Sequence, residues 1–243
     1  MRPSETSAGD GDKAMLKELM EAWRGRDLLT RMLGEFEEML VEAEWMYRTA
    51  WGVVYYEVAP KQVEAEIYAR DKKVNRMQRR VRRQIIEHLT LRPEANLAAC
   101  LVLMSVVKDA ERIGDYCKNI FQVTDMCTRG FEHGTYIDPL RHILSEIKGV
   151  FGRAREAFAT ADVHLAEQVM ATCRSLTKRC DLLISQLIRD TVPTEQAVAY
   201  TLLSRHFKRV ASHLTNIASA VVSPVHLIDF VDDSLRDELR GGV

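Results

Sequence analysis

Residues 92–120 read RPEANLAACLVLMSVVKDAERIGDYCKNI, and a related segment later in the chain shows that the sequence is built from a repeat. The second stretch, residues 189–217, reads RDTVPTEQAVAYTLLSRHFKRVASHLTNI. A shift of 97 positions aligns Arg92 with Arg189, and Asn119-Ile120 with Asn216-Ile217. Apolar residues of the first stretch recur every three or four positions, which predicts a helix with one buried face. These residues are Ala99, Leu103, Val106, Ala110, Ile113, Cys117 and Ile120.

The repeat extends towards the N-terminus of each half. With a shift of 102 positions, the apolar stripe Val63, Ile67, Val74, Val81 and Ile85 aligns with Leu165, Val169, Leu176, Leu183 and Leu187. The two shifts differ by five residues, and the difference falls between the second and third helix of each half, where a loop can absorb it. The chain is therefore predicted to be two tandem three-helix bundles, antiparallel because the connections are short.

The predicted elements make an all-α protein, since no segment shows strand alternation. Six long helices are expected at about 26–58, 60–89, 93–128, 138–159, 162–190 and 193–222, with Pro60, Pro93 and Pro193 at helix starts. Shorter helical patterns lie at 12–25 and in the tail. The expected organisation is a disordered segment 1–11, a first repeat with an N-terminal extension 12–134, a second repeat 135–225 and a tail 226–243.

Composition narrows the classes of function. The chain has 34 Lys and Arg against 35 Asp and Glu, a formal charge of −1, whereas nucleic-acid binders are usually strongly basic. The first residues lack the apolar core of a secretory signal, and the longest apolar run, 97–107, is about half of the ~20 residues of a membrane span. Five cysteines without a Cys-x-x-Cys pair predict neither disulfides nor a structural zinc site. We therefore expect a soluble, cytoplasmic protein.

Two carboxylates stand out on the helix expected at 93–128. Glu111 and Asp115 are four residues apart, so they project from the same face and repel each other unless they are neutralised. Asp71 lies at the edge of an apolar stripe on the preceding helix and can add a third carboxylate. Oxygen ligands of this kind suit hard cations, which predicts a metal site. Alternatively, Lys108 and Arg112 pair with the carboxylates as an ordinary ion-pair face.

Two further patterns are visible near this cluster. Leu97, Leu101 and Met104 form a second apolar side, so the first half of that helix is expected to be buried on both sides. A basic strip, defined as Lys72, Arg76, Arg79 and Arg83, follows helical spacing on the preceding helix. The strip predicts either a solvated helix face or a surface that binds an acidic partner or anionic lipid headgroups.

The segment AERIGDYCKNI, residues 110–120, resembles the E-R-x-G-D-x-x-x-N-I signature of the PhoU family of phosphate-uptake regulators. The upstream ARDKKVN, residues 69–75, is similar to its D-x-x-[IV]-[ND] pattern, and the tandem repeat also matches. The resemblance implies two three-helix bundles, a cytoplasmic location and metal ions on the acidic motifs, with iron, zinc, manganese or magnesium as alternatives. It also implies a phosphate ABC transporter or a sensor histidine kinase as partner. Apart from the resemblance, the sequence leaves open a homodimer and a peripheral position at the membrane.

The second repeat departs from this pattern. Under the two shifts, Asp71, Glu111 and Asp115 become Cys173, Lys208 and Ser212. A lysine in place of a carboxylate opposes cation binding by its charge. Metal is therefore expected at the first repeat and not at the second.

Three classes of function compete at this stage. The first is a non-enzymatic regulator of phosphate uptake and homeostasis with one metal site. The second is a metal-free helical adaptor. The third is a di-iron carboxylate enzyme, but such sites need Glu-x-x-His motifs, and no Glu here is followed by His three residues later. We therefore expect no enzymatic activity.

Overall fold

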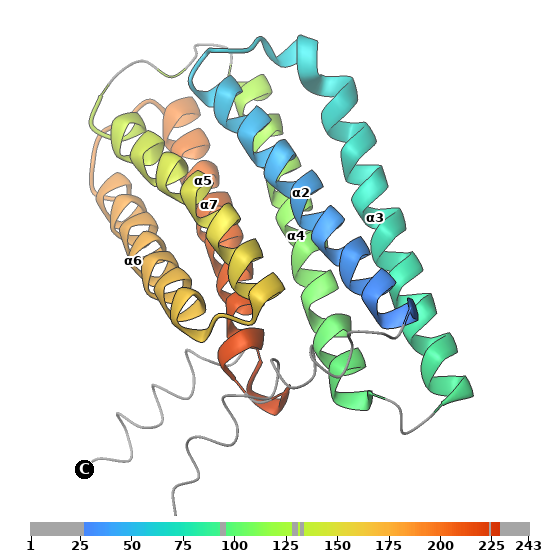
Figure 1. Ribbon diagram of the computed structural model, residues 1–243. Coiled ribbons are helices and arrows are strands. Elements are labelled where there is room, and N and C mark those ends of the chain that lie inside the picture. Colours follow the sequence, from blue (N-terminus) through green and yellow to red (C-terminus); the bar gives the residue numbers. More distant parts are fainter. Residues whose placement is uncertain (1–26, 93–95, 128–130, 132–133, 224, 229–243) are drawn as a thin grey trace, which may run out of the picture.

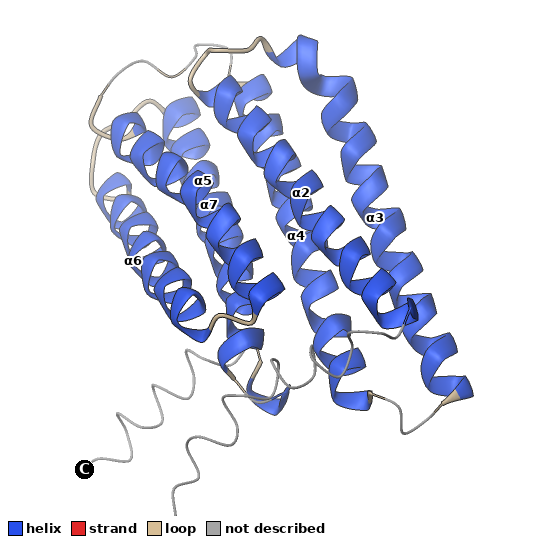
Figure 2. Ribbon diagram, viewed as in Figure 1, coloured by secondary structure: helices blue, strands red, loops and turns tan. Residues whose placement is uncertain are grey.

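The structure is a computed structural model that describes residues 27–92, 96–127, 131, 134–223 and 225–228. It contains the six long helices α2 (Asp27–Val54), α3 (Pro60–Leu91), α4 (Leu97–Met126), α5 (Ile137–Thr160), α6 (Val163–Leu187) and α7 (Thr194–Val222). A short 3-10 turn, η1 (Val225–Leu227), follows them. The described residues form no strand, as Figure 2 shows, so the all-α prediction is confirmed. The expected segments 1–11 and 12–25, and the tail from 229 onward, lie outside the described residues.

Local sequence explains where several helices begin. Pro60 opens α3, as its fixed φ and missing N–H favour. Asp162 caps α6 by accepting a hydrogen bond from the backbone N–H of Leu165 at 2.9 Å. The prediction that Pro93 opens the next helix is wrong, because α4 begins at Leu97. Asn96 before it has φ 61°, a left-handed conformation that a right-handed helix cannot contain.

The helices form two units of three, α2–α4 and α5–α7, that lie side by side (Figure 1). Within each unit, every helix contacts the other two, as expected for short antiparallel connections. The units join through α4 against α7 and through α2 against α5, which are the first and last helices of each repeat. The predicted pair of tandem three-helix bundles is therefore observed, and it places the acidic motif of α4 next to both α3 and the second unit.

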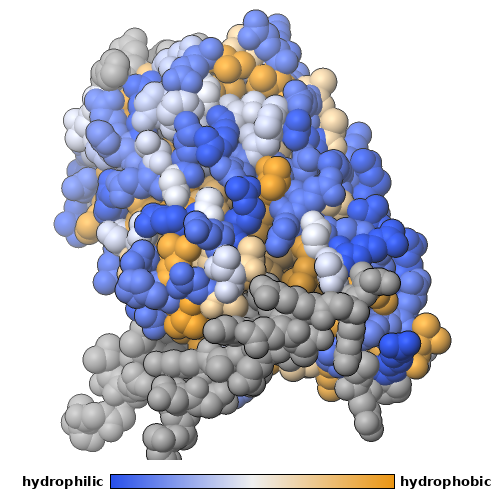
Figure 3. Space-filling view, in the orientation of Figure 1, coloured by the Kyte–Doolittle hydropathy of each residue, from blue (hydrophilic) through white to orange (hydrophobic). Residues whose placement is uncertain are grey.

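A single apolar core runs through both units. The predicted stripe of α3 is buried at Ile67, Val74, Val81 and Ile85, and the equivalent stripe of α6 is buried as well. Figure 3 shows the face of the molecule seen in Figure 1, where hydrophilic side chains dominate and apolar ones form scattered groups. Along the described helices, none is long and apolar enough to cross a membrane.

The expectation that the first half of α4 is buried on both sides is wrong. Leu97 and Leu101 are 49% and 48% exposed, and only Met104 packs partly against the core. The reason is the position of α4, which contacts α2, α3 and α7 on its other sides, so that no described helix packs over this one.

Buried polar contacts also tie the two units together. The hydroxyl of Tyr47, in the second half of α2, donates a hydrogen bond to the backbone carbonyl of Leu144 on α5 at 2.9 Å. Tyr47 is fully buried, and its ring packs against Phe151. Burial raises the pKa of Tyr47 well above its usual value, so the phenol remains protonated and able to donate. The interface between the units is therefore stabilised by a buried hydrogen bond as well as by apolar packing.

Candidate functional site

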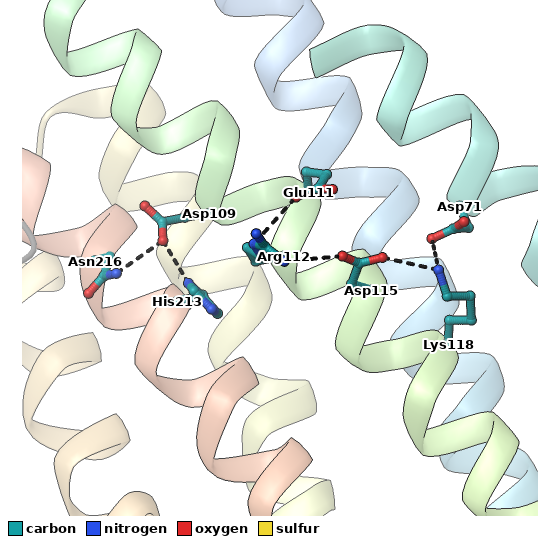
Figure 4. A network of polar contacts seen from close by, with 8 residues as sticks. All are labelled: Asp71, Asp109, Glu111, Arg112, Asp115, Lys118, His213 and Asn216. Atoms are coloured by element: carbon teal, nitrogen blue, oxygen red, sulfur yellow. Dashed lines mark hydrogen bonds and ion pairs between the residues drawn. The ribbon is translucent and has the colours of Figure 1, made fainter. Parts of the chain in front are cut away.

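The three predicted carboxylates belong to one polar network where α3 packs against α4 (Figure 4). Their side chains are 12%, 17% and 28% exposed for Asp71, Glu111 and Asp115. The ammonium of Lys118 bridges two of them, with its Nζ 2.9 Å from Asp71 Oδ1 and 3.0 Å from Asp115 Oδ1. Arg112 lies farther away, 3.8 Å from Glu111 and 3.6 Å from Asp115. The cluster is therefore neutralised in part by a lysine from one turn beyond the predicted motif.

The pKa shifts in the cluster show how its charges interact. Burial raises the pKa of Glu111, and the neighbouring charges of Asp115 and Asp71 raise it further, while Arg112 opposes them. Burial alone lowers the pKa of Lys118, but its hydrogen bonds to Asp71 and Asp115 outweigh burial, and the net shift is upward. Glu111 is thus the carboxylate whose charge is least compensated.

The carboxylate oxygens of these residues are suitable ligands for a hard cation, but in this conformation they are not arranged around a common position. Across the described part of the chain, no group of three or more His, Cys, Asp or Glu side chains is arranged to hold a metal ion. The Lys118 ammonium takes the position between Asp71 and Asp115 that a cation would need. Arg112, which was expected to pair with the carboxylates, lies 3.6–3.8 Å from two of them, and Lys118 makes shorter contacts. The metal site therefore stays a prediction.

The basic strip lies on α3 as expected, and three of its members, Arg76, Arg79 and Arg83, line a pocket of about 710 Å³ between α2 and α3. Lys72, the fourth, is exposed but does not line it. The remaining lining includes Lys73 and Arg80.

Glutamates of α2 neutralise much of this pocket. Lys73 pairs with Glu38 at 2.7 Å and with Glu42 at 2.8 Å, and Arg80 pairs with Glu35 at 2.7 Å. Among the described residues, Arg76 and Arg79 form no ion pair, although Arg79 Nε donates to the backbone carbonyl of Asn75 at 3.2 Å. The charge available to a partner is therefore concentrated on these two arginines.

A polar network that the sequence analysis missed joins α4 to α7. Asp109 is completely buried, and its Oδ1 accepts from Asn216 Nδ2 at 3.0 Å and lies 2.7 Å from His213 Nδ1 (Figure 4). The His213 ring also stacks on Tyr116, with centroids 5.7 Å apart. Two signals were available: Asp109 sits inside the apolar row of α4, and Asn216 is one of the few residues kept between the repeats. The network connects the two units directly beside the acidic motif.

The equivalent region of the second unit has lost its carboxylates. Cys173, in the place of Asp71, is buried, and burial raises the pKa of its thiol to about 12, so it carries no charge near neutral pH. Lys208, in the place of Glu111, bonds both carboxylate oxygens of Asp181 at 2.8 and 2.7 Å. Ser212, in the place of Asp115, donates to the Lys208 carbonyl of its own helix. The two units therefore share a scaffold but not a site.

Comparison with known proteins agrees with this duplicated architecture. The model of the PhoU domain matches residues 29–124 and 140–221, one match in each three-helix unit. This chain belongs to the PhoU domain family. The match covers both repeats, so the unit that has lost its acidic motif is still a PhoU domain by its pattern.

Similar proteins include two from Pseudomonas, each named a phosphate-specific transport system accessory protein PhoU homolog. The protein of Pseudomonas aeruginosa is 25% identical over 159 residues, covering 63% of this chain and 65% of its own length. The protein of Pseudomonas putida is 24% identical over 159 residues, which cover 63% of this chain and 62% of that protein. The chain thus spans somewhat less than two thirds of these relatives.

Solved PhoU structures share the fold. The crystal structure of PhoU from Pseudomonas aeruginosa superposes with a TM-score of 0.64 at 22% identity, covering 85% of this chain and 96% of that one. The crystal structure of the phosphate transport system regulatory protein PhoU from Streptococcus pneumoniae superposes with a TM-score of 0.65 at 18% identity. The superposition covers 79% of this chain and 94% of that one. Both agree with the tandem arrangement of helical units described above.

Proposed function

We propose that this protein is a regulator of phosphate uptake that acts by contact with other proteins and not by catalysis. The observation that carries the proposal is the PhoU domain match in both units, together with the names of the relatives as accessory proteins of phosphate-specific transport. The partner expected from the family resemblance is a phosphate ABC transporter or a sensor histidine kinase on the cytoplasmic side of the membrane.

The basic strip supplies the contact surface in this proposal. Arg76 and Arg79 are exposed on α3 and line the pocket together with Glu38 of α2. Guanidinium groups without ion pairs favour carboxylate-rich surfaces, because they form charge-assisted hydrogen bonds with them. An acidic face of the transporter or the kinase is the complementary partner.

A cellular experiment tests both the proposed regulatory function and the proposed contact surface. Deletion of the gene should disturb phosphate uptake under phosphate-replete conditions, and the wild-type gene should restore it. Complementation with Arg76→Glu/Arg79→Glu should fail although the variant is folded, while the matched variant Arg205→Glu/Arg209→Glu on α7 should restore regulation. Normal uptake in the deletion strain would contradict the proposed function, and full activity of the α3 variant would contradict the surface.

We also propose that Asp71, Glu111 and Asp115 bind a metal ion. Metal binding requires Lys118 to leave its two carboxylates, and a bound cation would then neutralise the cluster in its place. The competing function, a metal-free helical adaptor, is favoured by the short contacts of Lys118. Metal analysis of the purified protein, before and after Lys118→Met, distinguishes these two functions.

A further inference from the structure

The acidic cluster of the first unit has a basic counterpart at the same place in the second unit. A pocket of about 290 Å³ lies between α6 and α7. Its lining consists of Arg174, Thr177, Lys178, Asp181, Lys208, Ser212, Thr215 and Asn216. The repeat shifts relate Lys208, Ser212 and Thr215 to Glu111, Asp115 and Lys118 of the first unit. Two carboxylates and their neutralising lysine have thus been exchanged for one lysine and two hydroxyls.

The charge of this pocket is positive. Arg174 and Lys178 lie one turn apart on α6, and neither forms an ion pair among the described residues. Lys208 contributes a third cation from α7, and Asp181, the one acidic residue of the lining, is engaged by it through both carboxylate oxygens. An anion that enters the pocket therefore meets two uncompensated cations, with the single carboxylate already paired.

The neutral lining groups can donate hydrogen bonds to such an anion. The hydroxyls of Thr177, Ser212 and Thr215 donate to backbone carbonyls of their own helices at 2.9, 2.9 and 3.1 Å. Hydroxyl hydrogens rotate freely, and these bonds supplement the helical ladder without being needed for it, so the hydroxyls can turn towards a ligand at small cost. The pocket volume lies at the lower end of the range for small-molecule sites, which favours a compact ligand.

We propose that this pocket between α6 and α7 binds a small tetrahedral oxyanion with the chemistry of inorganic phosphate. Arg174 and Lys178 supply uncompensated charge, Lys208 is held by Asp181, and the hydroxyls of Ser212 and Thr215 supply neutral donors. The inference concerns binding by the isolated protein and goes beyond the proposed contact with a transporter or kinase.

Calorimetric titration with inorganic phosphate at pH 7.5 tests the proposal. EDTA is present throughout, so that a metal ion at the first unit cannot carry phosphate with it. The wild type should bind one phosphate per chain. The variant Arg174→Gln/Lys178→Gln should bind at least tenfold more weakly, because charge-assisted contacts are the strong ones in such a site. Asp181→Asn should bind severalfold more tightly, since it removes the repelling carboxylate and frees Lys208.

Two control variants separate a specific site from general electrostatic attraction. Lys61→Gln removes one positive charge at the start of α3, and Asp125→Asn removes one negative charge near the end of α4, both from exposed positions. Each should bind phosphate like the wild type. Effects of the controls equal to those of the pocket variants would overturn the proposal, as would absence of phosphate binding by the wild type.

A second titration identifies the form of the ligand. Adenosine monophosphate carries the same phosphoryl group on a larger body. Phosphate bound more tightly than the nucleotide supports the free ion as ligand, whereas a nucleotide preference contradicts it. Circular dichroism melting of each variant accompanies the titrations, so that loss of folding is not mistaken for loss of binding.

Discussion

Lys118→Met is the most informative single change in the acidic cluster. The substitution keeps the aliphatic stem and removes the ammonium that bonds Asp71 at 2.9 Å and Asp115 at 3.0 Å. A hydrogen bond to a charged group contributes about 1.5–3 kcal/mol when buried, and an exposed ion pair about 0–1 kcal/mol. The side chains here retain 12–28% exposure, which places the loss for both contacts together at about 2 kcal/mol.

The pH of the measurement follows from the shift of Lys118. Its pKa is raised in the folded protein, so its stabilisation is fully present below the pKa of the unfolded chain and is lost only as the pH rises through the higher folded value. Urea unfolding at pH 7 with EDTA therefore records the whole contribution. In a chain of this size, a loss of about 2 kcal/mol lowers the melting temperature by about 4–8 °C.

The matched control is Lys72→Met, the same chemical change at an exposed position of α3. It should leave stability within about 0.5 kcal/mol of the wild type. Equal stability of the two variants would contradict a stabilising role of the Lys118 ammonium. Repeating the unfolding with Mn²⁺ in place of EDTA extends the test, because a cation that binds the released carboxylates should stabilise Lys118→Met more than the wild type. No extra stabilisation of the variant would contradict the predicted metal site.

Other variants probe separate features. Glu111→Gln should stabilise the metal-free protein by about 0.5 kcal/mol at pH 7, since it relieves like-charge repulsion. Because the folded pKa of Glu111 is raised, this difference from the wild type should vanish as the pH falls towards 4 in denaturation curves. Asp109→Ala should cost about 3 kcal/mol by leaving His213 and Asn216 without their buried acceptor, and an unchanged urea midpoint would contradict this. Tyr47→Phe should cost about 1 kcal/mol by the same measurement.

The periodic residues were sufficient to predict the fold. Stripes such as Ile67, Val74 and Val81 determine which side of a helix is buried, and their recurrence in the second half determines the number of units. The start of α4 could not be placed in the same way, because the left-handed conformation of Asn96 depends on the path of the chain and not on a period. The exposure of Leu97 and Leu101 was missed for a related reason, since it depends on which sides of α4 its neighbours cover.

The candidate site was predicted in part. Helical spacing brought Glu111 and Asp115 together, and the position of Asp71 at the edge of a stripe indicated that it faces α4. The role of Lys118 was missed, because its reach to Asp71 depends on the rotation of α3 against α4, which spacing along one helix does not specify. The pairing of Lys73 with Glu38 and Glu42 was missed for the same reason, as it joins α3 to α2.

The shared core described above has a consequence for what either half of the chain can do alone. The hydrogen bonds of the Tyr47 hydroxyl and of Asp109 Oδ1 join residues of opposite halves, and α4 packs against α7. A half-length fragment would therefore present an open apolar face with an unpartnered buried carboxylate, which favours aggregation over independent folding. Although the sequence consists of two repeats, each three-helix unit depends on the other for its folding. Further divergence is consequently expected at positions outside the shared apolar core, as at the acidic cluster and the basic pocket.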